Sequence, residues 1–240
     1  MKKFLCSSIS LLGLSILSAN ADTLADWTFE SSGLGSSTPS YLPGANTSTT
    51  NFYAELGLQA GTAAATGLHV GNATYTSPSG DGSTKALSST LWAVNDYYQF
   101  QVNTLNYNNL AVSFEQISSG TGPASFSLQY SLDGLGFSPF SSYTVTNAPG
   151  WSPTAGPFSS SSFAFDLSSV LLLNNAAAVY FRLVDVNNTT DAAGTAGVGV
   201  GGTDRIDDFI VTGASTVPEP TTFALLGFGL LGLRVLRRKR

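Results

Sequence analysis

Apolar and polar residues alternate with a period of two through much of the middle of this chain, which is the pattern of half-buried β-strands. Between residues 91 and 102 the alternation predicts one strand with an apolar and a polar face. The apolar face would carry Trp92, Val94, Tyr98, Phe100 and Val102, and the polar face Asn95, Tyr97, Gln99 and Gln101. Residues 125–131 alternate in the same way, and Asp133-Gly134 predicts a hairpin turn into a strand over residues 137–145.

The whole pattern predicts a single all-β domain over residues 22–216. About eight to ten strands separated by Gly, Pro, Asn and Ser residues are typical of a β-sandwich, and a jelly roll is the best fit. A repeat of fixed period, which would indicate a solenoid or a propeller, is not found in the sequence. The remaining strands are expected at residues 24–30, 109–117, 163–167, 178–186 and 205–212, and only residues 167–173 look briefly helical.

Composition adds that the surface of this domain is polar but poor in charge. Only 10% of the 240 residues are charged, whereas about 25% is usual. Ser, Thr and Asn make up 72 residues, and 42% of the chain is hydrophobic, which is enough for a core. Residues 22–216 hold three cations, Lys85, Arg182 and Arg205, against 14 acidic residues, a net charge of −11. Nucleic acid and anionic lipid are therefore poor partners, and neutral sugars or divalent cations fit better.

The N-terminus has the order of features that defines a secretory signal peptide. Lys2 and Lys3 precede an apolar stretch over residues 4–17, and the small residues Ala19 and Ala21 then predict cleavage after Ala21 by the Sec-type export route. The alternative, a permanent N-terminal anchor, is disfavoured because the apolar run is short and residues 4–18 contain five serines. Cys6, the single cysteine, would leave with residues 1–21, so the mature chain would form no disulfide.

The C-terminus, residues 217–240, carries a second targeting pattern. Val217-Pro218-Glu219-Pro220 precedes an apolar run, and the chain ends in Arg237-Arg238-Lys239-Arg240. A transmembrane helix over about residues 221–236 is short against the roughly 20 residues of a stable span, so we expect a transient anchor in the inner membrane. The basic cluster is expected to stay on the cytoplasmic side, with the large domain outside.

These three elements in this order resemble the PEP-CTERM sorting signal of exported Gram-negative bacterial proteins. The resemblance covers about a tenth of the chain. It implies that an exosortase-type membrane protease recognises Pro218-Glu219-Pro220 and passes the protein toward the cell surface or an extracellular polysaccharide matrix. A sorting signal specifies a destination and leaves the activity of the domain open.

A second resemblance concerns the first and last strands of the domain. Trp27-Thr28-Phe29-Glu30 and Arg205-Ile206-Asp207-Asp208-Phe209 resemble the terminal strands of jelly-roll carbohydrate-binding modules. The resemblance implies that these strands are adjacent and share a structural calcium ion, with Glu30 and either Asp207 or Asp208 as its acidic ligands. The alternatives are that these acids are solvated, or that one of them pairs with Arg205.

Polar and aromatic side chains offer a candidate surface for an extracellular polysaccharide. Tyr97, Gln99 and Gln101 share the polar strand face, and Trp151 lies in a Pro- and Gly-rich loop. Aromatic stacking and amide hydrogen bonds would suit a sugar chain. The alternative is that Trp151 closes one end of the sandwich and that Tyr97 packs beneath a loop.

The sequence gives little support for catalysis. His69 is the single histidine and reads as a packed strand residue, and the chain has no Gly-x-Ser-x-Gly motif. Glycoside hydrolysis by a pair of carboxylates stays open because acidic residues are available. We therefore expect an exported, non-catalytic structural or adhesive protein, with a carbohydrate-binding module that contains structural calcium as the alternative.

Overall fold

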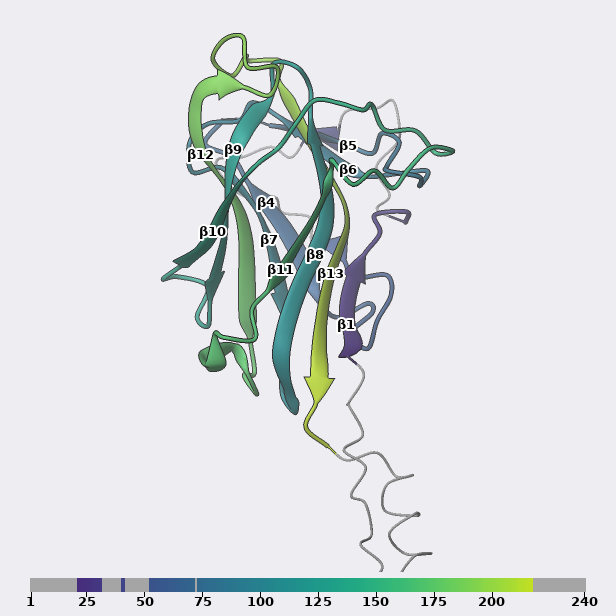
Figure 1. Cartoon of the computed structure of the whole chain (residues 1–240), viewed down its shortest axis with the longest axis vertical. Helices are drawn as coiled ribbons and strands as arrows, with labels where there is room; N and C mark the ends of the chain where they lie inside the picture. Colours follow the sequence, from purple (N-terminus) through teal and green to yellow (C-terminus); the bar gives the residue numbers. More distant parts are fainter. Residues whose placement is uncertain (1–20, 32–39, 42–51, 72, 218–240) are drawn as a thin grey trace, which may run out of the picture.

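The computed structural model describes residues 21–31, 40–41, 52–71 and 73–217, and this part of the chain is an all-β sandwich of two antiparallel sheets (Figure 1). One 3-10 turn, η1 (Leu171–Leu173), is the only helical element within the described ranges. The strands are β1 (Ala21–Trp27), β2 (Ser40–Tyr41), β3 (Phe52–Tyr53), β4 (Ala64–Leu68), β5 (Thr74–Thr76), β6 (Leu87–Thr90), β7 (Tyr97–Val102), β8 (Tyr107–Ser118), β9 (Pro123–Ser131), β10 (Ser138–Thr144), β11 (Ser162–Asp166), β12 (Val179–Asp191) and β13 (Thr203–Ser215).

The two sheets are built from strands that lie far apart in the sequence. Sheet A has the order β11-β8-β13-β6-β5-β2, and β1 pairs with β13 beyond the residues that β6 contacts. Sheet B has the order β10-β9-β12-β7-β4-β3. The chain changes sheets between β2 and β3, between β4 and β5, at each step from β6 to β9, and at each step from β10 to β13. These crossings give the sandwich of the expected jelly-roll class.

The core lies between the sheets and is rich in aromatic rings. Phe100 of β7 and Phe209 of β13 stack with centroids 3.6 Å apart and ring planes 3° apart. Trp27 of β1 packs edge-on against both rings, at 5.1 and 5.8 Å, and its indole N–H donates to the carbonyl of Phe52 at 3.1 Å. Because these three side chains come from both sheets, and from the first, seventh and last strands, they join the sandwich into one unit.

Most of the predicted strands are confirmed, with shifted ends. The hairpin at Asp133-Gly134 joins β9 to β10, and the strands expected near residues 109, 163, 178 and 205 are β8, β11, β12 and β13. The first strand begins earlier than predicted and ends at Trp27, before Phe29 takes a left-handed φ of 56°. The helical pattern is reduced to η1.

The strand predicted over residues 91–102 is wrong in its first half. Only β7 is extended there, while residues 91–96 form a loop in which Leu91 and Asn95 have positive φ. The carboxylate of Asp96 accepts the Ala93 N–H at 2.7 Å, so a local turn replaces the strand. Val94 is therefore 43% exposed instead of facing the core, whereas Trp92 is buried.

Both ends of the described domain lie at the same end of the sandwich. Ala21 at the start of β1 pairs with Ala214 near the end of β13, and Figure 1 shows both strand ends at the bottom of the view. Residues 1–20 and 218–240, which hold Ala19, most of the expected signal peptide, the expected helix over 221–236 and the basic cluster, lie outside the described residues. Within the described residues, no helix is long and apolar enough to cross a membrane.

Candidate functional site

The polar face predicted for β7 is the outer face of sheet B. Tyr97 and Gln99 are half-buried there and Gln101 is exposed, while the residues between them are buried in the core. The antiparallel register sets Gln99 directly opposite Arg182 of β12. Opposed residues in neighbouring strands project to the same face, so Arg182 belongs to this surface as well.

Arg182 is held between two aromatic rings. Its guanidinium carbon lies 3.7 Å from the ring centroid of Tyr97 and 3.6 Å from that of Phe137, which follows the β9–β10 turn. Its Nε donates to Oε1 of Gln99 at 2.8 Å. Burial lowers the pKa of Arg182 from its usual value and raises that of Tyr97, whereas the contact between them acts in the opposite direction. One face of each ring is thus covered by the guanidinium.

Sequence reasoning missed Arg182 and Phe137. The available signal was that Arg182 is one of three cations in residues 22–216 and lies in a predicted strand with alternating residues. Its partners depend on the register between β7 and β12 and on the path of a turn, which local patterns do not determine.

The Trp151 ring is not exposed on the outer face of sheet B. It is only 7% exposed and packs in a second buried cluster with Ala86 and Ile117, against which Phe158 is partly buried. The side chain borders a small hollow of about 150 Å³ that is also lined by Arg205. The loop folds the indole into an apolar cluster of its own, as in the alternative in which Trp151 packs instead of binding, and a sugar-binding role for Trp151 stays a prediction.

The acids predicted at the terminal strands are brought together by one loop, residues 81–85. Glu30 accepts hydrogen bonds from the Lys85 N–H at 2.8 Å and from the Thr84 hydroxyl. Asp207 accepts from the Ser83 hydroxyl at 2.6 Å and from the Asp81 N–H at 3.1 Å. The adjacency of the first and last strands, and of their acids, is thus present in the structure.

Further carboxyl groups surround these acids and change their electrostatics. Burial, followed by repulsion from Asp208, raises the pKa of Asp26 to about 6 and that of Glu115 to about 8. Burial raises the pKa of Asp207 to about 7 despite its hydrogen bond from Ser83. We call the seven residues Asp26, Glu30, Glu55, Asp81, Glu115, Asp207 and Asp208 the acidic cluster.

Glu30 differs in the direction of its pKa shift from Asp26, Glu115, Asp207 and Asp208, whose pKa values are raised. Burial acts to raise its pKa, but hydrogen bonds from Thr84 and Lys85 outweigh it, and the pKa is lowered. Other oxygens of the cluster lack partners among the described residues, namely Asp26 Oδ1, Asp81 Oδ1 and Glu115 Oε2. Buried oxygens of this kind are costly unless a proton or a cation satisfies them.

The acidic cluster is not a preformed metal site. Across the described part of the chain, no group of three or more His, Cys, Asp or Glu side chains is arranged so that it could hold a metal ion. A calcium ion needs about six to eight oxygens, so carboxylates here would have to move and to be joined by hydroxyl or carbonyl oxygens. The carboxylate oxygens without partners are suitable calcium ligands, but they are not arranged around one point as a bound ion would require.

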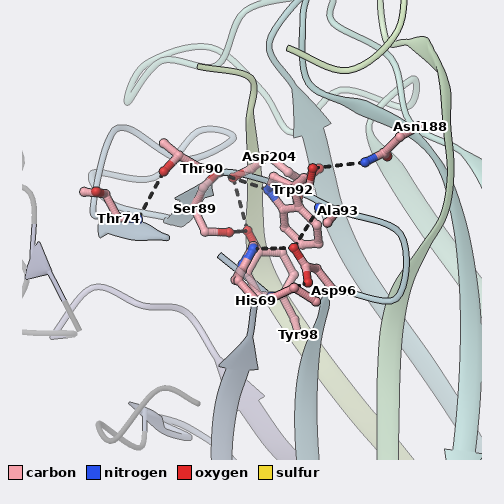
Figure 2. Close-up of polar contacts among 11 residues, drawn as sticks. His69, Thr74, Ser89, Thr90, Trp92, Ala93, Asp96, Tyr98, Asn188 and Asp204 are labelled. Carbon is pink, nitrogen blue, oxygen red and sulfur yellow. Dashed lines mark hydrogen bonds and ion pairs between the residues drawn. The ribbon is translucent and has the colours of Figure 1, made fainter. Parts of the chain in front are cut away.

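His69 belongs to a buried polar network between the sheets (Figure 2). Its Nδ1 lies 3.1 Å from Oδ2 of Asp96, and its ring packs edge-on against Trp92 at 4.5 Å. Asp96 also accepts the N–H groups of Val70 and Ala93, so it fixes the loop before β7. The imidazole is 3% exposed, and this burial favours a structural role for the pair.

A neighbouring part of the network centres on Asp204, which is fully buried. Its carboxylate accepts from Gln116 Nε2 at 3.0 Å and from the Ser118 hydroxyl at 2.9 Å, and burial raises its pKa well above the usual range. The Tyr98 hydroxyl donates to the Asp204 carbonyl, which connects β7 of sheet B to β13 of sheet A. The network therefore specifies how the two sheets are aligned.

Comparison with known proteins assigns the tail. Residues 216–240 match the PEP-CTERM protein-sorting motif, as the resemblance of residues 217–240 predicted. The motif implies an exported protein with a C-terminal membrane-anchoring sorting signal, processed in general by an exosortase and export machinery. No curated protein matches the chain by sequence.

The solved structures that the chain distantly resembles include carbohydrate-binding and adhesin domains. TmCBM61 in complex with beta-1,4-galactotriose is 12% identical, with a TM-score of 0.36 over 63% of this chain and 88% of that one. The K2 cleaved adhesin domain of Lys-gingipain is 14% identical, with a TM-score of 0.37 over 80% and 96%. An Arthrobacter globiformis T6 isomalto-dextranase complexed with panose is 9% identical, with a TM-score of 0.33 over 81% of this chain and 32% of that one. These distant likenesses assign no function.

Proposed function

We propose that this protein is a non-catalytic, adhesive component of the cell surface or extracellular matrix. The sorting motif at residues 216–240 carries the export part of this proposal. In this account the Sec-type machinery exports the chain, the tail anchors it transiently in the inner membrane, and an exosortase-type protease then releases it. The part that stays outside is the sandwich, residues 22–216.

The outer face of sheet B is the proposed contact surface. Tyr97, Gln99, Gln101 and Arg182 lie together there, and they combine aromatic edges with amide and guanidinium donors. Hydroxyl-rich polymers offer both acceptors for such donors and C–H faces for such rings. A polysaccharide of the matrix is therefore the proposed partner.

Affinity electrophoresis through gels that contain a panel of neutral and acidic polysaccharides tests this surface. Retardation of the mature chain by at least one polymer is expected, and Tyr97→Ala or Gln101→Ala should weaken it. Leu58→Ala is the control because Leu58 is an exposed apolar side chain outside sheet B, in a segment whose backbone hydrogen-bonds to β1 of sheet A. Mobility that is identical in all gels would overturn the proposal, and shortening of a polymer by the protein would overturn its non-catalytic part.

The second candidate is a carbohydrate-binding module stabilised by calcium at the terminal strands. The orphaned oxygens of Asp26, Asp81 and Glu115 favour it, since a cation near Glu30 and Asp207 would satisfy them and relieve the repulsion among the acids. Glu30 with Asp207 or Asp208 would supply its acidic ligands. A bound calcium ion would neutralise the nearby carboxylates and hold the terminal strands together, and it would have no catalytic role.

Thermal melting with calcium and with a chelator tests this candidate. A higher Tm in calcium that Asp207→Asn abolishes is expected if the ion binds here. Asp166→Asn is the control, because Asp166 is exposed and lies outside the acidic cluster. Equal melting in calcium and in chelator would remove calcium from the account and leave the adhesive proposal standing.

A further inference from the structure

Arg182 is a cation without an anionic partner in an acidic domain. Residues 22–216 contain 14 acidic residues, all of them described, and the only contact within 4.0 Å between a basic side chain and a carboxylate among them is His69–Asp96. The guanidinium of Arg182 makes one hydrogen bond, from Nε to Gln99, with a described residue. Four N–H donors on its two terminal nitrogens are left for another group.

The setting of Arg182 prepares it for a ligand. Stacking between Tyr97 and Phe137 restricts the side chain, and the hydrogen bond to Gln99 fixes the rotation of the guanidinium plane. The ring faces compensate part of the lost hydration but donate no lone pair to the terminal N–H groups. A carboxylate would supply two acceptors in the geometry of the guanidinium fork.

We propose that Arg182 binds the carboxylate groups of an acidic, uronic acid-containing polysaccharide. This inference rests on the proposed function and names the class of polymer that the outer face of sheet B takes. Arg182 on β12 has an amide side chain opposite it on each neighbouring strand, Gln99 on β7 and Gln129 on β9. Gln101, two residues beyond Gln99, is exposed beside the site. These amides suit the hydroxyl groups of the sugar units.

The net charge of −11 means that a polyanion would bind this domain only through a specific local contact. A polyanion is repelled by the domain as a whole, so diffuse attraction does not bring it to the surface. Binding therefore depends on the single local cation, and removal of Arg182 should have a larger effect than removal of an equal charge elsewhere. The proposal thus departs from the expectation from overall charge that neutral sugars or divalent cations fit the domain better.

The test compares one polymer in two chemical forms. The full chain in a neutral detergent is applied to immobilised polygalacturonate and to its fully methyl-esterified form, with a chelator present so that divalent cations cannot bridge acidic groups. Retention on the acid form is expected, with little on the ester. Arg182→Gln should weaken retention by roughly ten- to a hundredfold, the effect of losing a hydrogen bond to a charged group. Arg182→Lys should be intermediate, because it keeps the charge and loses the fork.

Lys85→Gln is the matched control, since it removes one positive charge outside the site. It should bind as the unchanged chain does, and the melting temperature of each variant shows whether it is folded. Equal retention on acid and ester, or retention that Arg182→Gln leaves unchanged, would overturn the inference while carbohydrate binding stands. No retention on these forms or on neutral polymers would overturn the proposed polysaccharide binding as well.

Discussion

Glu30 and Asp207 hold the same short loop, although 176 residues separate them in the chain. Glu30 accepts from the backbone of Lys85, and Asp207 accepts from the side chain of Ser83. The loop therefore connects the end of the first strand to the last strand. Because several carboxyl groups surround the loop, their ionisation changes the stability of the folded domain.

The first prediction is that stability falls as pH rises from about 5 to 8. The pKa values of Asp26, Asp207 and Glu115 are raised to about 6, 7 and 8, whereas acids in the unfolded chain titrate near 4. The folded state thus binds more protons in this window, so its stabilisation is present at low pH and is lost as each group ionises. Urea unfolding of residues 22–216 across this range, with a chelator present, measures the slope.

Glu115→Gln provides the internal check on that slope. It removes the carboxyl group with the highest of these pKa values, so stability should vary less between pH 7 and 8. Asp166→Asn changes the same charge outside the acidic cluster and should leave the slope unchanged, because hydrogen bonds from Ser168 lower the pKa of Asp166 and keep it ionised throughout this range. Stability that rises steadily from pH 5 to 8 would contradict this account of the acidic cluster.

The second prediction concerns the joint between the sheets. Phe209→Ala should lower the free energy of unfolding by roughly 3–5 kcal/mol, because it leaves a cavity at the stack with Phe100 and Trp27. Phe137→Ala, on a partly exposed ring, should cost far less stability. Denaturant unfolding of the two variants measures both losses of stability. Equal losses would contradict a central role for Phe209 in the core.

The third prediction separates Trp151 from the binding surface. Trp151→Ala should destabilise the domain by about 3 kcal/mol, since the indole is buried with Ala86 and Ile117. Polysaccharide retention per folded molecule should stay unchanged. If Trp151→Ala abolishes retention at full stability, the hollow beside Arg205 is the binding site instead of the outer face of sheet B.

The fourth prediction addresses sorting. Replacement of Pro218-Glu219-Pro220 by three alanines should leave the chain in the membrane fraction with its tail attached, because the protease would lose its recognition segment. Thr222→Ala is the control and should be processed normally. Cell fractionation followed by mass measurement of the C-terminus distinguishes the two, and normal release of the triple variant would contradict the proposed processing route.

What the sequence predicted, and what it missed, follows from the range of the interactions involved. Alternation is local, so it correctly placed Tyr97, Gln99 and Gln101 on one face of β7. The pairing of Arg182 with Gln99 depends on inter-strand register, and its contact with Phe137 depends on the β9–β10 turn. Both contacts join residues that are far apart in the sequence, so the local pattern of residues does not predict them.

Two further differences have the same physical origin. Residues 91–96 alternate like a strand, but Asp96 captures a nearby N–H group and makes a turn, which outweighs the pattern. Trp151 sits in a loop with Pro and Gly, where the sequence left both an exposed and a packed ring open, and Ala86 and Ile117 from distant elements bury it. The adjacency of Glu30 and Asp207 was predicted by resemblance to terminal strands and not by any local pattern.

Hydrogen–deuterium exchange of the mature chain, with and without a retained polysaccharide, locates the contact surface. We expect protection to increase in β7, in β12 around Arg182 and in the β9–β10 turn, while sheet A and the loop around Trp151 are unchanged. Protection confined to sheet A or to residues 147–151 would contradict the claim that the outer face of sheet B is the adhesive surface of this protein.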